Sequence, residues 1–470
     1  MAIKLKFLGA AQNVTGSRYV IETGSARVLV DCGTYQEREL NVRNWDPFPV
    51  PPASLNAVLL THAHLDHCGS LPRLARDGFR GPVFATDATV DIAKLTLLDS
   101  ARLQEEDAAF KRRRHAREGR QGPHPELPLY TVADVQACAR QFQPVAYGQP
   151  RAVAEGLEAT WFDAGHILGS ALIQMRIRDG NRACTVVFSG DVGRWERPIL
   201  QDPTPCPPAD YVLVESTYGA RLHEDAASIA DLLATAICGT RERGGNVVIP
   251  AFVIERTQDV LYYLNDLLRA NRIPHLVVFV DSPMAISVTE VFEQHPEIVD
   301  AEMLQRLRSH ASPFHFTGLK MVRAVDESKA INHIQGTSII MAGSGMCTGG
   351  RIKYHLANNL SRPECTVLFV GYQAVGTLGR VIADGASSVR VLGQTITVRA
   401  QVARINGFSA HADRNELQRW LAGLEGHPPR QVFVTHGEPA AAASFAALLR
   451  QKAGWAATAP QYGDEVTLAG

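Results

Sequence analysis

One short stretch, residues 61–67 (THAHLDH), constrains this chain more than any other. It holds three histidines and one aspartate, and imidazole and carboxylate groups are the ligands that bind zinc and similar divalent metals. The spacing is too tight for one metal to use all four side chains, so we expect His62 and His64 to face one ion and Asp66 and His67 a second. The alternative is a polar loop that caps a helix, with Asp66 as a first-turn carboxylate. The apolar run AVLL just before the stretch predicts a short buried strand.

The bulk composition is that of an ordinary globular protein. The chain has 470 residues, of which 46% are hydrophobic and 20% charged, so we expect roughly two to four domains. The formal net charge of −1 means that a nucleic-acid partner would need a local basic surface. The eight cysteines are scattered and form no CxxC pair, which suits a reducing compartment. The sequence contains neither a signal peptide nor an apolar run of membrane-spanning length, which predicts a cytoplasmic protein with no membrane partner.

The pattern of strands and helices divides the chain into three segments. Residues 1–208 contain short strands separated by glycine-containing turns. In residues 209–394, continuous apolar strands alternate with helices, which is the pattern of a parallel sheet buried on both faces. Residues 395–470 contain a strand, a helix and a further strand. We therefore expect an α/β protein in which the middle segment forms a domain of its own.

Polar residues recur directly or closely after the predicted apolar strands. They are Asp31, His62, Asp191, Glu215 and His436. In layered α/β proteins such strand ends face the ligand crevice. Each residue alone is weak evidence, because a single histidine more often has a structural role. Together they indicate one site assembled from several strands.

The stretch HAHLDH after a short strand is similar to the metal-binding motif of the metallo-β-lactamase superfamily. Asp31, His166 and Asp191 match the family's first, third and fourth motifs. The resemblance implies an αββα sandwich that binds two Zn²⁺ ions per chain. The implied ligands of one zinc are His62, His64 and His166, those of the second are Asp66, His67 and His436, and Asp191 bridges both. Asp66 and Asp31 are expected in the catalytic set, with Asp31 orienting a ligand histidine.

Three further motifs narrow the resemblance to the β-CASP group of nucleases, and within it to bacterial and archaeal relatives of the cleavage-and-polyadenylation endonuclease. Glu215 in VESTYG, His411 in FSAHAD and His436 before a glycine match this group's motifs. In this group an α/β domain with a parallel sheet is inserted before the final strands of the sandwich. The resemblance implies that His411, oriented by Glu215, donates a proton to the leaving 3′-oxygen.

Two stretches are candidates for contact with a nucleic-acid backbone. The strongest basic run, KRRRHAREGR, covers residues 111–120, and the alternative for it is a solvated loop. The glycine-rich run MAGSGMCTGGR, residues 341–351, follows a predicted strand and opens a helix, where backbone N–H groups attract phosphate. The alternative there is a tight turn. The predicted substrate-binding residues are Arg112, Arg113 and Arg114 in the basic run, and Ser344, Gly345, Thr348 and Arg351 in the glycine-rich run.

These features predict a zinc-dependent ribonuclease that cuts single-stranded RNA endonucleolytically by a two-metal mechanism and leaves 5′-phosphate and 3′-hydroxyl ends. We expect the strand in a cleft between the two domains. A 5′-to-3′ exoribonuclease is the nearest alternative. The sequence does not decide between RNA and DNA as the substrate, or between a monomer and a homodimer. A non-catalytic RNA-binding scaffold is disfavoured because no metal ligand is missing. A hydrolase of small thioesters or lactams would leave the inserted domain, Glu215 and His411 unexplained.

Overall fold

The computed structural model describes residues 2–119, 126–223, 229–374, 376–452 and 454–469. The chain divides into two compact units, which are described separately. Unit 1 comprises Met1–Glu196, Gln201–Leu222 and His411–Gly470, and unit 2 comprises Arg197–Leu200 and His223–Ala410. The boundaries drawn from the sequence, at residues 208/209 and 394/395, stay a prediction.

Unit 1 is built on two seven-stranded sheets, with the orders β22-β1-β2-β3-β4-β5-β6 and β21-β20-β11-β10-β9-β8-β7. In each sheet, antiparallel neighbours at one end give way to parallel neighbours at the other. The strands of the first sheet are β1 (Ile3–Phe7), β2 (Tyr19–Glu22), β3 (Arg27–Val30), β4 (Ala57–Leu59), β5 (Val83–Thr86), β6 (Phe142–Val145) and β22 (Glu465–Leu468). Those of the second are β7 (Arg151–Ala154), β8 (Leu157–Asp163), β9 (Ala171–Asp179), β10 (Arg182–Phe188), β11 (Tyr211–Glu215), β20 (Gln431–Thr435) and β21 (Ala457–Thr458).

The two sheets pack face to face through a core of apolar side chains. Because successive residues of a strand face opposite sides, Ile3, Leu5 and Phe7 of β1 all reach this core, where they meet Trp161 of the other sheet. The rings of Phe7 and Phe433, one from each sheet, have centroids 5.2 Å apart. Unit 1 is therefore a β-sandwich with its main core between the sheets.

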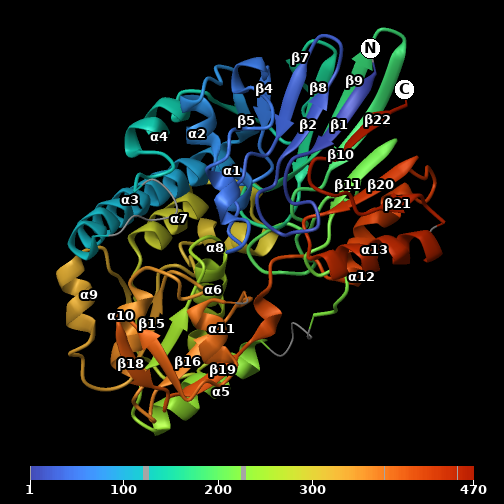
Figure 1. The fold of residues 1–470 in the computed structure, drawn as a ribbon. Coiled ribbons are helices and arrows are strands. Elements are labelled where there is room, and N and C mark those ends of the chain that lie inside the picture. The colour runs from blue at the N-terminus through green and yellow to red at the C-terminus, as the bar shows by residue number, and fades with distance from the viewer. Residues whose placement is uncertain (1, 120–125, 224–228, 375, 453, 470) are drawn as a thin grey trace. The chain divides into compact units, whose positions relative to one another are not determined.

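Helices cover the outer faces of both sheets (Figure 1). On the second sheet, α12 (Arg414–Leu421) and α13 (Pro439–Lys452) bury Trp420 and Phe445. The helices on the side of the first sheet are α1 (Leu65–Cys68), α2 (Leu71–Arg76), α3 (Asp87–Glu118) and α4 (Val132–Ala139), of which α3 contacts β5 and β6. This order of layers confirms the predicted αββα sandwich.

Helix α3 is buried in its first half and exposed in its second. The Thr86 side chain caps its start by accepting a backbone N–H bond, and Gly119 ends it in the left-handed conformation, at φ 62°. Ile92 and Leu97 are buried, whereas Phe110 is 57% exposed. The structure has one continuous helix over this stretch. Its exposed half carries the basic run, of which residue 120 lies outside the described residues.

Unit 2 holds a six-stranded sheet in which all neighbours run parallel, in the order β14-β13-β15-β12-β16-β19. Its strands are β12 (Val247–Pro250), β13 (Val277–Val280), β14 (Leu319–Met321), β15 (Ser338–Ala342), β16 (Thr366–Phe369) and β19 (Gln401–Arg404), and a separate hairpin consists of β17 (Ser388–Val391) and β18 (Gln394–Thr397). The helices are α5 (Ile229–Glu242), α6 (Arg256–Arg269), α7 (Pro283–Gln294), α8 (Ala301–Arg308), α9 (Val325–Ile331), α10 (Ile352–Asn359) and α11 (Leu378–Ala383). The central strands β12, β15 and β16 are buried along their whole length. The parallel-sheet domain predicted from the apolar strands is therefore confirmed. Strand β19 joins this sheet although it lies beyond residue 394, because it pairs with β16.

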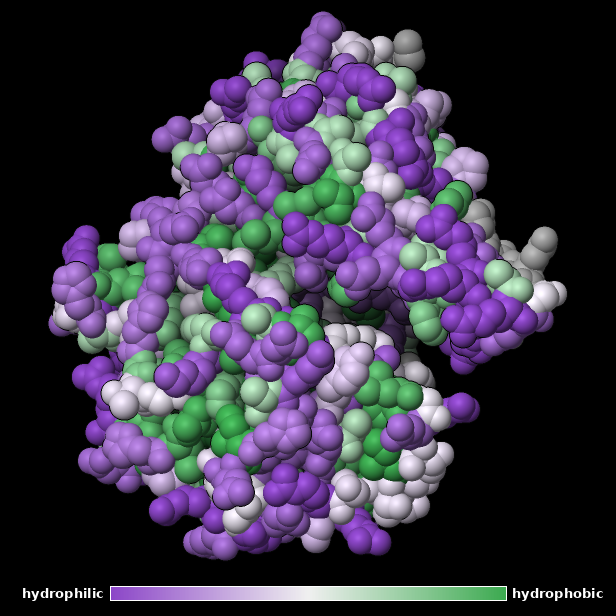
Figure 2. Space-filling view, turned by 90° about the vertical axis from the view of Figure 1, so that its left-hand side faces the viewer, coloured by the Kyte–Doolittle hydropathy of each residue, from purple (hydrophilic) through white to green (hydrophobic). Residues whose placement is uncertain are grey.

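Among the described residues, no helix is both long enough and apolar enough to cross a membrane. The face of the molecule drawn in Figure 2 is hydrophilic over most of its area, and its hydrophobic patches are scattered between polar side chains.

Candidate metal centre

Five polar residues at the ends of strands or just after them meet at one edge of the unit 1 sandwich. Asp31 and His62 follow the neighbouring strands β3 and β4, Asp191 and His436 follow β10 and β20, and Glu215 is the last residue of β11, which lies between β10 and β20. Parallel neighbours end at the same edge of a sheet, so each set lies side by side. The packing of one sheet on the other then brings the two sets together.

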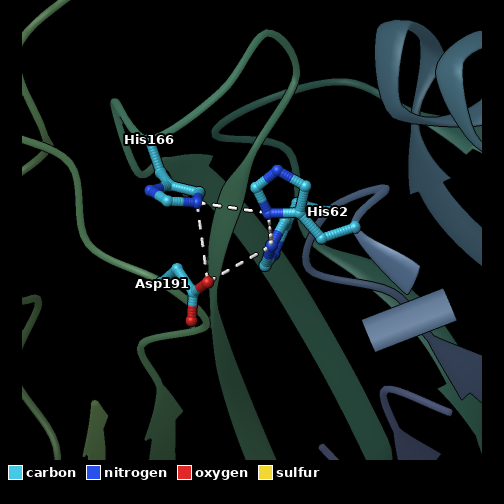
Figure 3. Close-up of side chains that lie close together, drawn as sticks. His62, His166 and Asp191 are labelled. Atoms are coloured by element: carbon cyan, nitrogen blue, oxygen red, sulfur yellow. Dashed lines mark hydrogen bonds and ion pairs between the residues drawn. The ribbon is translucent and has the colours of Figure 1, made fainter. Parts of the chain in front are cut away.

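The first group of ligand atoms comes from His62, His64, His166 and Asp191. His62 Nε2 lies 3.0 Å from His64 Nδ1 and 3.4 Å from Asp191 Oδ2. His166 Nε2 lies 3.4 Å from His64 Nδ1 and 3.5 Å from Asp191 Oδ2. Figure 3 shows the rings of His62 and His166 turned toward the carboxylate of Asp191. The four side chains therefore converge on one point.

The second group comes from Asp66, His67 and His436. His436 Nε2 lies 3.1 Å from His67 Nε2 and 3.6 Å from Asp66 Oδ2. Asp191 also reaches this group, because its Oδ1 lies 3.4 Å from His67 Nε2 and 3.4 Å from His436 Nδ1. One carboxylate thus turns Oδ2 to the first group and Oδ1 to the second.

The residues present fit zinc. Asp191 Oδ1 is buried and accepts no hydrogen bond from any residue that the structure describes. A buried carboxylate oxygen without a partner is costly unless a cation satisfies it. Imidazole nitrogens and carboxylate oxygens are the donor set that zinc takes.

Burial and neighbouring charges put His62, His64 and Asp191 in their metal-binding forms, whereas the carboxylates around His67 and His436 outweigh burial and raise the pKa of both rings. Burial lowers the pKa of His62 to about 3 and that of His64 to about 4, so both rings are neutral and have a free lone pair. Burial opposes charge on Asp191, but the rings of His436 and His67 outweigh it and hold the pKa of that carboxyl well below its usual value. Neutral imidazole and ionised carboxylate are the forms that bind a metal.

Asp31 lies behind the second group and holds His67 in place. Its Oδ2 lies 2.7 Å from His67 Nδ1. The same carboxylate accepts hydrogen bonds from the Thr61 backbone N–H at 2.9 Å and from the Thr61 hydroxyl at 2.9 Å. Asp31 can therefore accept the Nδ1 proton of His67 and leave the Nε2 lone pair facing the group, and its orienting role stays a prediction.

His411 and Glu215 form an ion pair beside the first group. His411 Nδ1 lies 3.1 Å from Glu215 Oε1 and 3.9 Å from Asp191 Oδ2. Glu215 is fully buried and also accepts the Val192 backbone N–H at 2.8 Å. Burial lowers the pKa of His411, but the two carboxylates outweigh it and raise that pKa to about 9. The ring is 22% exposed, so solvent can reach it.

The predicted substrate-binding arginines of unit 1 are on the exposed half of α3. Arg112, Arg113 and Arg114 are all exposed. Arg114 Nε binds Glu118 Oε1 at 2.8 Å, one helical turn away. Residues 111–118 of the run are thus helical, and not the solvated loop that was the alternative.

The predicted substrate-binding residues of unit 2 are largely engaged in local contacts. Ser344 Oγ accepts the backbone N–H groups of Thr348 at 3.1 Å and Gly349 at 3.3 Å. Arg351 donates to Asp281 Oδ1 at 2.6 Å and to the Arg323 carbonyl at 2.7 Å. Gly345 packs against the ring of Phe252 so closely that an added Cβ would lie 2.5 Å from it. A role for these residues in substrate binding stays a prediction.

Sequence reasoning assigned no role to two threonines at the site. The hydroxyl of Thr61 binds Asp31, and Thr217 Oγ1 lies 3.1 Å from His436 Nδ1. Both residues stand inside motifs that were noted for their neighbours. A threonine hydroxyl gives no signal of its own in a sequence, because most threonines bind only their own backbone or water.

Three family models match the chain. They are the metallo-β-lactamase superfamily over residues 13–79, the β-CASP domain over residues 257–382, and the Zn-dependent metallo-hydrolase RNA specificity domain over residues 395–460. The resemblance inferred from the motifs is therefore confirmed.

Curated relatives and a solved structure agree with these matches. The chain is 38% identical to ribonuclease TTHA0252 of Thermus thermophilus, over 92% of both chains. It is 32% identical to the transcription termination factor FttA of Methanocaldococcus jannaschii, over 96% of this chain and 69% of that one. A crystal structure of a protein of unknown function from Enterococcus faecalis V583 has the same fold, with a TM-score of 0.56 and 12% identity over the full length of both chains. The chain therefore belongs to the metallo-β-lactamase superfamily, in the group that carries a β-CASP domain and a Zn-dependent metallo-hydrolase RNA specificity domain.

Proposed function

We propose that this chain is a zinc-dependent ribonuclease that cuts RNA at internal phosphodiester bonds and leaves 5′-phosphate and 3′-hydroxyl ends. One observation carries the proposal. Two groups of ligand atoms lie side by side and share Asp191, with one carboxylate oxygen turned to each group. A carboxylate shared in this way suits two metal ions that act on one phosphate.

Each group of ligand atoms would hold one ion. His62, His64 and His166 would hold one zinc, Asp66, His67 and His436 would hold the other, and Asp191 would contact both. Bound zinc would lower the pKa of the attacking water and neutralise charge on the phosphoryl oxygens. Asp31 keeps the Nδ1 proton of His67 on the side away from the ions.

His411 is the proposed general acid. Its charged ring lies next to Asp191, so it stands beside the place where both groups of ligands meet. Glu215 keeps the ring protonated and fixes its Nδ1 side, which leaves Nε2 to donate a proton to the leaving 3′-oxygen. The donor is needed because an alkoxide leaves poorly without a proton.

Three features support RNA as the substrate. The C-terminal match is to an RNA specificity domain, and the relative at 38% identity is named a ribonuclease. The exposed half of α3 carries Arg112, Arg113 and Arg114 directly after the exposed ring of Phe110. Arginines beside an exposed aromatic ring suit a single strand, whose phosphates bind the cations and whose bases can stack on the ring.

A labelling experiment tests the proposal. Purified protein is given RNA and DNA of the same sequence, labelled internally or at the 5′ end, with chelator, without chelator, and with zinc restored. We expect RNA fragments of intermediate length that disappear with chelator and return with zinc. A product consisting only of mononucleotides from the 5′ end would indicate an exonuclease instead. Equal cleavage of DNA would contradict the RNA preference, and chelator-resistant cleavage would contradict the metal requirement.

A further inference from the structure

Thr217 stands at the junction between the second ligand group and the acid pair. It follows strand β11, whose last residue Glu215 is paired with Thr435 of β20, so the residues after the two strands lie together. Thr217 Oγ1 lies 3.1 Å from His436 Nδ1 and 3.1 Å from the His436 carbonyl oxygen. The Thr217 backbone N–H donates to Glu215 Oε2 at 3.3 Å. One residue thus touches a proposed zinc ligand and the proposed partner of the general acid.

The hydrogen-bonding capacity of these groups determines where the protons are. A carbonyl oxygen can only accept, and a hydroxyl has a single proton, so the Thr217 hydroxyl donates to the His436 carbonyl. In that arrangement the lone pair of the hydroxyl faces His436 Nδ1, and the Nδ1–H form of the ring bonds with it.

We propose that Thr217 is a positioning residue that holds His436 in the Nδ1–H tautomer and so aims its Nε2 lone pair at the second metal position. That lone pair points toward His67 Nε2, 3.1 Å away, and Asp66 Oδ2, 3.6 Å away. Asp31 orients His67 in the same way, through its contact with His67 Nδ1. The partner of His436 Nδ1 is a neutral hydroxyl, whereas the partner of His67 Nδ1 is a carboxylate. A hydroxyl raises the basicity of a ligand histidine less than a carboxylate does.

The segment around Thr217 is rigid enough for this role. The Ser216 backbone N–H donates to the His436 carbonyl at 3.2 Å, and the Ser216 hydroxyl donates to the Thr435 carbonyl at 2.8 Å. An added Cβ at Gly437 would lie 2.2 Å from Ser216 Oγ, so the turn after β20 fits closely around this segment. The Thr217 hydroxyl therefore has little freedom to turn elsewhere.

The test uses Thr217→Val, which keeps the shape and removes the hydroxyl, and Thr217→Ser, which keeps the hydroxyl. The control is Thr96→Val on α3, because Thr96 is buried and its hydroxyl also donates to a backbone carbonyl, that of Ile92 at 2.8 Å, with no histidine involved.

The first readout is zinc retention by the holoprotein in competition with a chelator. Loss of an outer partner of a ligand histidine typically weakens metal affinity about 10- to 100-fold, so we expect Thr217→Val to lose one zinc at a correspondingly lower chelator concentration. Thr217→Ser and Thr96→Val should stay within about twofold of the wild type by the same measure.

The second readout is the tautomer of His436 in the metal-free protein, from ¹⁵N-edited NMR spectra of the imidazoles. We expect the Nδ1–H form in the wild type and in Thr217→Ser, and a mixture of tautomers in Thr217→Val. An Nε2–H tautomer in the wild type, unchanged zinc retention in Thr217→Val, or an equal loss in Thr217→Ser would overturn the assignment.

The inference rests on the proposed two-metal site, yet the two can fail separately. A wild-type protein that binds fewer than two zincs defeats the proposed function, whereas the tautomer of the metal-free ring decides the role of Thr217.

Discussion

The ion pair between His411 and Glu215 makes a prediction about pH. The Glu215→Gln variant keeps the size of the side chain and removes its charge. In the wild type, the rise in the His411 pKa from 6.5 to about 9 corresponds to roughly 3 kcal/mol in favour of the charged ring. Two carboxylates supply this preference, but Asp191 would be neutralised by bound metal, so the charge of Glu215 is the part that remains in the working enzyme.

The size of the effect follows from the protonated fraction. A general acid works only while protonated, so its activity falls as pH rises through its pKa. With a pKa of about 9, about 97% of His411 rings carry the proton at pH 7.5, whereas about 9% do so with the usual pKa of about 6.5. The Glu215→Gln variant should therefore cleave RNA about tenfold more slowly than the wild type at pH 7.5, and less than about twofold more slowly at pH 6. Bound metal would remove the share of the rise that Asp191 supplies, so about tenfold corresponds to the full rise and a smaller ratio to the charge of Glu215 alone.

The assay is single-turnover cleavage of labelled RNA from pH 5.5 to about 9.5 with zinc saturating, and the quantity compared is the ratio of the variant rate to the wild-type rate. His411→Ala is the first control, because without the ring the ratio should be low and constant until the wild type loses its own proton, toward a pH of about 9. Glu158→Gln is the matched charge control, since the Glu158 side chain on β8 is 45% exposed and pairs only with Arg176 among the described residues. Zinc content and melting temperature are measured for each variant. A Glu215→Gln ratio that stays constant across the pH range would refute the claim that Glu215 keeps His411 charged.

Three further predictions concern the metals, the basic run and the leaving group. Asp191→Asn should contain fewer than two zincs per chain by elemental analysis and should lose more than the roughly 100-fold that a missing acid catalyst costs; full zinc content would contradict the shared carboxylate. Replacing Arg112, Arg113 and Arg114 by Ser should weaken RNA binding and reduce the log–log salt slope by up to about 2, and an unchanged slope would leave the run without phosphate contacts. His411→Ala should keep its zinc and lose roughly 100-fold in rate, and RNA with a 3′-bridging sulfur should rescue it, because that leaving group needs little protonation. Loss of zinc in His411→Ala, or no rescue, would make His411 a ligand or a binding residue.

Local sequence patterns were sufficient to predict the layers of the fold and part of the candidate site. Continuous apolar strands such as β12 and β15 predicted a parallel sheet buried on both faces, because burial on both sides demands apolar residues at every position. Polar residues after strands, such as Asp31 and Asp191, marked the end of the sandwich where the site lies. These signals are contained within a few residues of sequence, which is why a single chain reveals them.

Long-range pairings could not be predicted in this way. His67 Nε2 and His436 Nε2 lie 3.1 Å apart but are separated by 369 positions, so only the family resemblance joined them. The side-chain partners of Arg351 are equally hidden in the sequence. It was expected to contact substrate, and its guanidinium is bound to Asp281 and a backbone carbonyl. Thr217 escaped notice because its role depends on a neighbouring strand that lies far away in the chain.

Cleavage of a closed circular RNA tests the central claim most directly, because a circle has no end from which an exonuclease could start. The circle is incubated with the zinc-loaded protein, with the same protein after chelation, and with Asp191→Asn. The account predicts that only the zinc-loaded wild type opens the circle, and that the linear product carries a 5′-phosphate and a 3′-hydroxyl. An intact circle under conditions in which linear RNA of the same sequence is degraded, or a circle opened equally well after chelation, would contradict it.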